Sequence, residues 1–177
     1  SMLFAAGKDT HHKATEMRIG IINFQKCVEK SHVGKEELGK LESLKNEFQA
    51  SFEEKQKEYS VLAEKLQNQE YMESLSPTAK AELEDQMKTL TEQFQMLNMQ
   101  AQNTIQEAQG RMVQTINGEI SKAAEYLARE NNLDLIINEE MCFYHKRPSD
   151  FTALVVNELN RHFDDDVLKA EAEKEVK

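Results

Sequence analysis

The stretch that decides the fold is residues 83–127, LEDQMKTLTEQFQMLNMQAQNTIQEAQGRMVQTINGEISKAAEYL. Its apolar residues recur at steps of three and four, at a mean spacing of about 3.7 residues, which indicates one long amphipathic helix. Because this spacing is nearer an eleven-residue repeat than a heptad, the helix should run nearly straight. The stripe comprises Leu83, Met87, Leu90, Phe94, Leu97, Ala101, Ile105, Ala108, Met112, Ile116, Ile120, Ala123 and Leu127.

A second helical stripe precedes the first in the chain. It begins near residue 35 and comprises Leu41, Leu44, Phe48, Phe52, Tyr59, Leu62 and Leu66. Ser76-Pro77 separates the two stripes, with serine placed as an N-cap and proline at the first helical position. The sequence therefore predicts two helices, over 35–73 and 78–130, of roughly 58 Å and roughly 80 Å at 1.5 Å per residue.

Short β-type segments flank this helical pair. Residues 19–24, IGIINF, are apolar on both faces, as in a covered strand. Residues 133–137 and 141–144 predict a β-hairpin with its turn at 138–140. Ser149-Asp150 then caps a helix over 151–163, whose buried side should carry Leu154, Val155 and Leu159.

The predicted architecture is mainly α, with a small β body from which a long antiparallel coiled-coil hairpin projects as an arm. Two helices of this length cannot bury a core of their own, and three strands from one chain leave open sheet edges. We therefore expect the β body to oligomerise. The residues predicted to mediate assembly are Ile19, Ile21, Ile22, Phe24, Leu135, Ile137 and Phe143.

The predicted segments along the chain are five. Residues 1–17 form a disordered N-terminus in which Leu3–Gly7 would be the remnant of a signal peptide. Residues 18–34 begin the β body, 35–130 form the arm, and 131–163 complete the body with its C-terminal helix. Residues 164–177 are an acidic, charged tail that is predicted to be frayed.

The arm carries a second apolar line on the side away from its own seam. Helical angles place a few apolar residues of each helix roughly 140–200° from that seam. They are Ala50, Val61 and Met72 on the first helix, and Met96 and Met99 on the second. Methionine suits surfaces that must accept many shapes, so we predict that this line binds unfolded polypeptide. The alternative is that these are isolated surface residues without a role.

Composition excludes several functional classes. The net charge of −10 argues against nucleic-acid binding, which depends on Lys and Arg. The sequence has no apolar run of about 18 residues, and so no predicted transmembrane segment. It also lacks a Gly-rich phosphate loop, an HExxH motif and a GxSxG motif. We therefore expect no enzymatic activity, no cofactor and no metal, and we interpret His11-His12 as solvated.

Three motifs of the predicted body resemble the Skp/OmpH family of periplasmic chaperones. They are Ile19–Asn23, Asn132–Asn138, and Ser149–Thr152 followed by Leu159-Asn160. The resemblance covers about residues 18–163 and includes the order of the elements. It implies a jellyfish-like homotrimer in the periplasm, whose three arms surround a cavity. Unfolded outer-membrane proteins would be held there without ATP, and a signal peptide would direct export.

One feature departs from the family pattern. Residues 35–127 contain ten Lys/Arg and seventeen Asp/Glu, a net charge of −7, whereas the best-known relatives are basic. An acidic arm repels anionic lipid, so an anionic lipid site is not expected, although transient membrane association is left open. Capture of clients should instead depend on the apolar line.

Two alternative functions stay open at this point. A structural coiled-coil adaptor that clasps one folded partner would also explain the long helices, although it would favour a strict heptad. A prefoldin-like chaperone places its hairpins between its two helices, whereas here the strands flank the helical pair.

Cys27 and Cys142 both belong to the predicted body, Cys27 after the first strand and Cys142 in the last one. One alternative is two buried free thiols. A second is a disulfide within or between chains, which an oxidising compartment would permit and which would make client holding sensitive to redox state. A third is that the thiols are reactive and lie at the surface.

Overall fold

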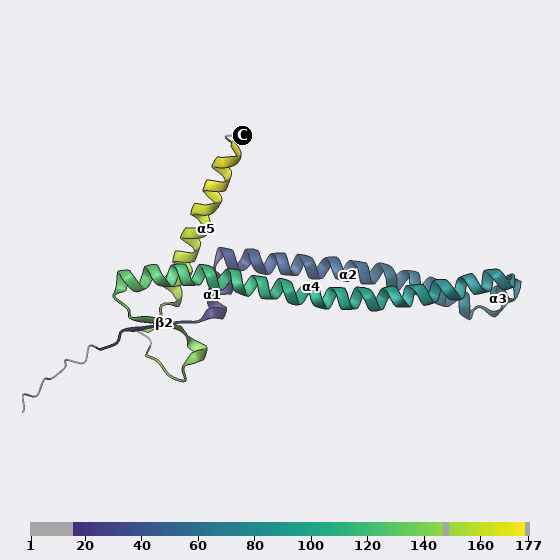
Figure 1. Cartoon of the computed structure of the whole chain (residues 1–177), viewed down its shortest axis with the longest axis horizontal. Coiled ribbons are helices and arrows are strands. Elements are labelled where there is room, and N and C mark those ends of the chain that lie inside the picture. The colour runs from purple at the N-terminus through teal and green to yellow at the C-terminus, as the bar shows by residue number, and fades with distance from the viewer. Residues whose placement is uncertain (1–15, 147–148, 176–177) are drawn as a thin grey trace, which may run out of the picture.

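The computed structural model describes residues 16–146 and 149–175, which form a long helical rod on a small base (Figure 1). The predicted signal remnant Leu3–Gly7 and the pair His11-His12 lie outside the described residues. The elements are β1 (Ile19–Ile22), α1 (Phe24–Lys30), α2 (His32–Gln67), α3 (Gln69–Ser74), α4 (Pro77–Asn131), β2 (Leu135–Asn138), the 3₁₀ helix η1 (Glu139–Met141) and α5 (Thr152–Glu175).

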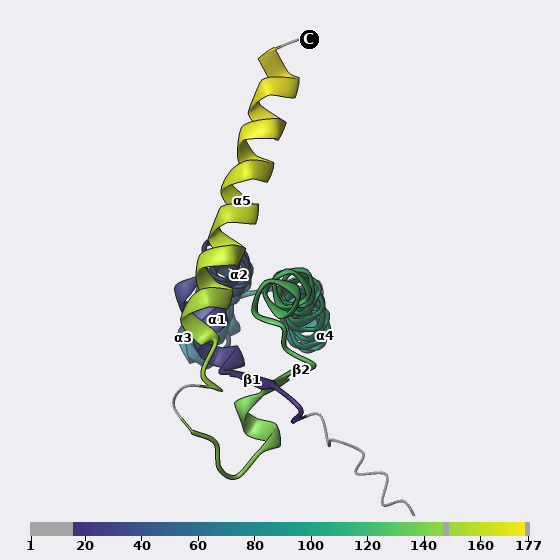
Figure 2. The same ribbon diagram turned by 90° about the vertical axis from the view of Figure 1, so that its left-hand side faces the viewer.

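The rod consists of α2 and α4, which lie side by side and antiparallel, with α3 at the far tip (Figures 1 and 2). The predicted start of the second helix is confirmed: Ser76 Oγ accepts a hydrogen bond from Ala79 N at 3.2 Å, and Pro77 is the first helical residue. The helix ends at Asn131, one residue beyond the predicted end, and Asn132 after it has φ 50°, in the left-handed region. A mainly helical chain with a small sheet is therefore confirmed.

The predicted first helix is in fact divided. Helix α2 ends at Gln67, and Asn68 adopts an extended conformation in which its Oδ1 accepts from Tyr71 N at 2.9 Å. This asparagine caps α3, so the chain turns at the tip through a separate short helix.

A helix that was not predicted follows the first strand. Asn23 Oδ1 accepts from Lys26 N at 2.8 Å, which caps α1 and ends β1 at Ile22. The predicted strand 19–24 was therefore too long, and Phe24 is helical. Ser31, which is fully buried, caps α2 by accepting from Gly34 N at 3.1 Å.

The sheet has two strands among the described residues. β1 and β2 run parallel, in register from Ile19 opposite Leu135 to Ile22 opposite Asn138. On the other side of β1, Ile21 O accepts from Phe151 N at 2.7 Å. The segments that flank the two long helices thus meet beside the root of the rod, as the sequence predicted.

The predicted β-hairpin was wrong. β2 pairs with β1, residues 139–141 are a 3₁₀ helix, and residues 142–144 form no strand. Cys142 and Phe143 therefore do not lie in a strand. The physical reason is that the large apolar side chains of this segment are not covered by the rest of the chain: Met141, Phe143 and Tyr144 are 79%, 112% and 80% exposed.

Helix α5 begins close to its predicted start, where Asp150 Oδ1 accepts from Thr152 N at 2.9 Å. It continues to Glu175, so the prediction of a helix ending at residue 163 and a frayed tail was wrong. Two polar contacts support the extension: Asp164 Oδ1 lies 2.9 Å from His32 Nδ1, within hydrogen-bond distance, and Asp165 forms an ion pair with Arg161 at 3.4 Å. Leu154 was placed on the wrong face and is 45% exposed.

The main core lies at the root of the rod, where α5 crosses α2 and α4 and then projects away from the sheet (Figure 2). Four segments contribute to it: the end of β1, the α1–α2 joint, the last third of α4 and the first turns of α5. Its members are Ile22, Cys27, Val28, Val33, Ile116, Ile120, Ala123, Leu127, Val155, Val156 and Leu159.

Candidate functional site

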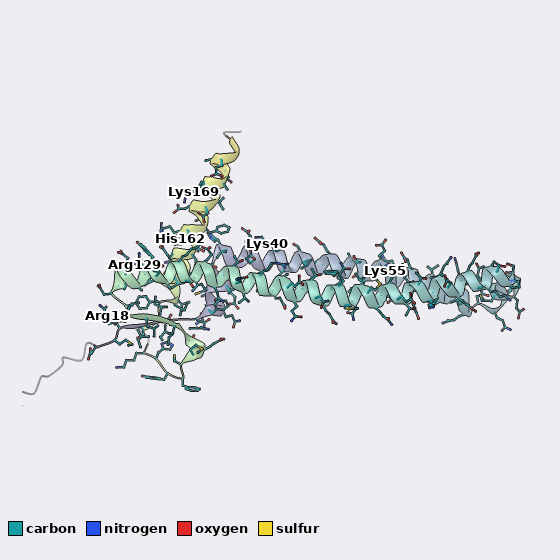
Figure 3. The ribbon with its side chains drawn as sticks, in the orientation of Figure 1. Arg18, Lys40, Lys55, Arg129, His162 and Lys169 are labelled. Carbon is teal, nitrogen blue, oxygen red and sulfur yellow. The ribbon has the colours of Figure 1, made fainter. Side chains whose placement is uncertain are left out.

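The rod formed by α2 and α4 corresponds to the predicted arm, and the seam between its two helices is apolar and aromatic. Phe94 of α4 stacks on Phe52 of α2 with ring centroids 6.4 Å apart, and it meets Tyr59 edge-on at 6.3 Å. Lys55 Nζ, midway along the rod in Figure 3, donates to Gln93 Oε1 at 2.7 Å. These contacts fix the register in which α2 faces α4.

Met96 and Met99 lie on the side of α4 that faces away from this seam. They are 66% and 60% exposed, in agreement with the helical angles. Together with Gln100, Asn103 and Thr104 they line a shallow hollow of about 350 Å³. The hollow lies within residues 93–106, a stretch that contains no charged residue. It offers two flexible thioethers surrounded by uncharged polar groups, a surface suited to varied apolar segments.

Val61 is also exposed, at 51%, but it belongs to a different surface. With Leu62 and Leu90 it lines a groove of about 630 Å³ between α2 and α4. Lys57, Glu58 and Asp85 are among the polar residues of the same groove. The structure therefore brings Met96 and Met99 together and places Val61 in a separate groove nearer the tip.

The two remaining residues of the predicted line differ from each other. Ala50 is exposed on α2, whereas Met72 is half-buried in α3 at the tip. The eleven-residue spacing from Val61 predicted that Met72 lies on the same helix. Helix α2 ends before Asn68, however, and Met72 lies on α3. Its neighbour Tyr71, which is 37% exposed, was missed.

The sequence also missed the groove around Leu62 and Leu90. Both residues were assigned to the seam on periodicity alone, and Leu90 is indeed buried. A two-helix rod leaves the flanks of its seam open, so residues at the seam edge contribute to exposed grooves as well. These seam-edge residues can be identified only from the register between α2 and α4, and the apolar stripe of one helix does not contain this information.

The residues predicted to mediate assembly divide into two groups. Ile21 and Ile22 are 4% and 5% exposed, so they are already buried within the protomer. Ile19, Leu135 and Phe143 are 37%, 43% and 112% exposed and remain available to a partner. Phe24 and Ile137 are half-buried.

A polar network holds the loop after β2 against the start of α1. Asn23 Nδ2 donates to Glu139 Oε2 at 2.7 Å, and His145 Nε2 lies 3.4 Å from the other carboxylate oxygen. These two hydrogen bonds lower the pKa of Glu139 below its usual value. Asn138 Oδ1 accepts from Phe24 N at 3.2 Å. The exposed segment 141–144 is thereby anchored at both ends to the base.

Cys27 and Cys142 are both free thiols, and their environments differ. Cys27 is fully buried in the root core, and burial, followed by the charge of Asp150, raises its pKa to about 11. Cys142 is half-buried, with its Sγ 3.5 Å from Glu139 O. Whether a disulfide forms within or between chains stays a prediction.

We expect a thiol reagent to modify Cys142 in the folded protein within minutes and Cys27 only after denaturation, because the Cys27 thiolate is disfavoured and inaccessible. Ellman titration with and without urea measures both thiols, and Cys27→Ser identifies the slow one. Two fast thiols would show that the root core is open, and no fast thiol after oxidation would support a disulfide.

The pKa of Cys27 is raised from 9.0 to about 11 in the folded protein, so the buried thiol contributes fully to stability below pH 9, and this contribution is lost as the pH rises from 9 to about 11.

The described residues contain no group of three or more His, Cys, Asp or Glu side chains placed to hold a metal ion. In the same part of the chain, no helix has both the length and the apolar character needed to cross a lipid bilayer.

The structure is thus a mainly helical protein in which a long, solvent-exposed helical hairpin, with apolar hollows on its flanks, stands on a small sheet. The chain belongs to the OmpH-like family of outer membrane proteins, whose model matches residues 18–159. This chaperone family is not enzymatic and is typically periplasmic.

Related proteins agree with this assignment. A Skp-like protein of Chlamydia pneumoniae is 30% identical over 150 residues, covering 85% of this chain and 88% of the relative. A Skp-like protein of Chlamydia muridarum is 29% identical over 163 residues, covering 92% and 94%. A crystal structure described as an OmpH-like outer membrane chaperone from Caulobacter crescentus superposes with a TM-score of 0.73 at 14% identity, covering 90% of this chain and 92% of that one. The likeness to this last protein concerns the fold alone.

Proposed function

We propose that this protein is an ATP-independent periplasmic holdase that binds unfolded outer-membrane proteins along its arms and prevents their aggregation. The observation that carries the proposal is the exposure of Met96 and Met99 on the flank of the arm, away from the seam. Membership of the OmpH-like family and the names of the Skp-like relatives support it. Because the arm is acidic, apolar contact is the main source of affinity for clients.

The proposal includes a homotrimer assembled through the base. The exposed apolar residues Ile19, Leu135 and Phe143 support assembly there, since a monomer would leave them in water. Three acidic arms repel one another, which would keep a central space open for a client. Light scattering provides the test: three times the chain mass supports the proposal, and a monomer at all concentrations overturns it.

The paired replacement Met96→Glu with Met99→Glu should weaken client holding by about tenfold, because it removes the two exposed apolar contacts and adds like charge to an acidic arm. The measurement is suppression of aggregation for two or three unrelated unfolded proteins as a function of chaperone concentration. Both side chains are solvent-exposed, so helicity and assembly should be unchanged.

Gln95→Glu with Gln102→Glu is the matched control, since it adds the same two charges to exposed positions of α4 and keeps both methionines. If the control weakens holding as much as the methionine pair, charge and not apolar contact governs capture. An adaptor specific for one folded partner would fail to suppress aggregation of any of the test proteins, and that result would overturn the holdase.

A further inference from the structure

A further groove lies at the fork where α5 leaves the rod. Its volume is about 360 Å³, and α2, α4 and α5 all contribute to its lining. The apolar part of the lining consists of Val33, Leu159, Phe163, Val167 and Ala170. In Figure 3 the labelled Lys40 and His162 lie near the crossing of α5 with the rod, and Lys169 lies on the projecting part.

The apolar stripe of α5 continues beyond the elements that cover it. Leu159, Phe163 and Val167 are spaced by four residues and therefore share one face of the helix. Leu159 is 1% exposed, Phe163 is half-buried, and Val167 is 41% exposed. The same face thus passes from the root core into an open groove, which leaves apolar surface available to a further segment of polypeptide.

The polar lining of this groove is acidic. Glu36 and Glu37 come from α2, Glu119 from α4 and Asp166 from α5, and Lys40 is the one basic residue in the lining. Lys40 Nζ lies 2.5 Å from Glu36 and 2.7 Å from Glu37, so one cation is shared between two carboxylates. Outside the lining, Lys122 lies 2.7 Å from Glu119 and Lys169 lies 3.6 Å from Asp166. The free part of α5 adds further acid, with five Asp/Glu and one Lys over residues 164–173.

We propose that this fork groove docks a basic amphipathic segment of a partner polypeptide, with apolar side chains against Phe163 and Val167 and Lys or Arg toward the acidic rim. An apolar floor with a rim in which carboxylates outnumber lysines favours a segment of the opposite sign. A second copy of this chain is a poor occupant, because its net charge is −10 and its arm is acidic. An anionic lipid surface is repelled for the same reason. The proposal does not depend on client holding by the arms.

The test uses the full chain and a 16-residue peptide of Leu and Lys at helical spacing that carries a photo-crosslinker. A peptide of the same pattern with Glu in place of Lys is the control that shows whether binding depends on the charge of the peptide. Cross-linked positions are mapped by mass spectrometry, which separates binding at the fork from binding along the arm. We expect the Lys peptide to label residues 159–170, the Glu peptide to leave them unlabelled, and 0.5 M salt to reduce the labelling strongly.

Two variants of α5 sharpen the test. Val167→Lys removes an apolar contact and adds repulsion, and should lower labelling at the fork by about tenfold. Leu168→Lys makes the same charge change next to it at a position 64% exposed on another face, and should change labelling by less than about twofold. Equal loss in both variants, equal labelling by the Glu peptide, or absence of labels at the fork overturns the proposal. A change in oligomer mass with Val167→Lys would assign the groove to contacts between copies and would also overturn it.

Discussion

Replacing Gly34 by alanine should destabilise the protein by at least about 3 kcal/mol, one of the two largest effects that we expect from a single substitution. A Cβ at this position would lie 1.9 Å from the carbonyl oxygen of Val28, 2.6 Å from its carbonyl carbon and 2.8 Å from its Cα. All three atoms belong to the backbone, so no side-chain rotation relieves the contact. Either α1 or α2 must move.

That movement would disturb the root core, because the α1–α2 joint is tightly constrained. Ser31, at the joint, is fully buried; its N donates to Cys27 O at 3.1 Å and its Oγ accepts from Gly34 N. Val28 and Val33, on either side of it, both belong to the core. Displacing α1 by an ångström would therefore break a helix cap and loosen core packing together.

Gly39→Ala is the matched control, since Gly39 lies in the same helix and a Cβ there meets no atom within 4 Å. Because alanine is the better helix former, this variant should be more stable than the wild type by about 0.5–1 kcal/mol. Urea unfolding followed by circular dichroism measures both variants. If Gly34→Ala unfolds at the same urea concentration as the wild type, the close approach of α1 to α2 is wrong.

The sequence predicted the helical arm well because its signals are local. Apolar residues at steps of three and four and an N-cap serine before a proline each act within a few residues. The close approach of α1 to Gly34 carried no such signal. A glycine within a helix predicts lower helix stability. Only the packing of α1 shows that there is no room for a side chain at Gly34.

The part of the base that follows α4 was predicted poorly because its structure depends on contacts that are distant in the sequence. Residues 133–144 contain two apolar runs separated by a polar turn, a pattern that a local hairpin and a long-range parallel pair share equally. Parallel pairing of β2 with β1 depends on contacts more than a hundred residues apart. Similarly, helical angles predicted the exposure of Met96 and Met99, but grouping them apart from Val61 required the register between two helices.

Ile21→Asp should unfold the base, because Ile21 is 4% exposed and a carboxylate there would be buried without a partner. The expected loss is about 3–5 kcal/mol. Ile21 pairs with Ile137 on one side and bridges to Asp150 on the other, so the new charge would also lie near an existing carboxylate. Loss of cooperative urea unfolding, or a strongly lowered midpoint, is the measurement.

Ile19→Asp separates folding of the protomer from its assembly. Ile19 lies on the same strand and is 37% exposed, so its replacement should cost the protomer less than about 1 kcal/mol. In the proposed trimer, however, the same change places a charge in an interface between chains. We therefore expect Ile19→Asp to keep its helical circular dichroism while light scattering shows a smaller particle, and Ile21→Asp to lose both. A variant at Ile19 that keeps the full assembled mass would remove this end of β1 from the interface and leave Leu135 and Phe143 as the residues that hold the copies together.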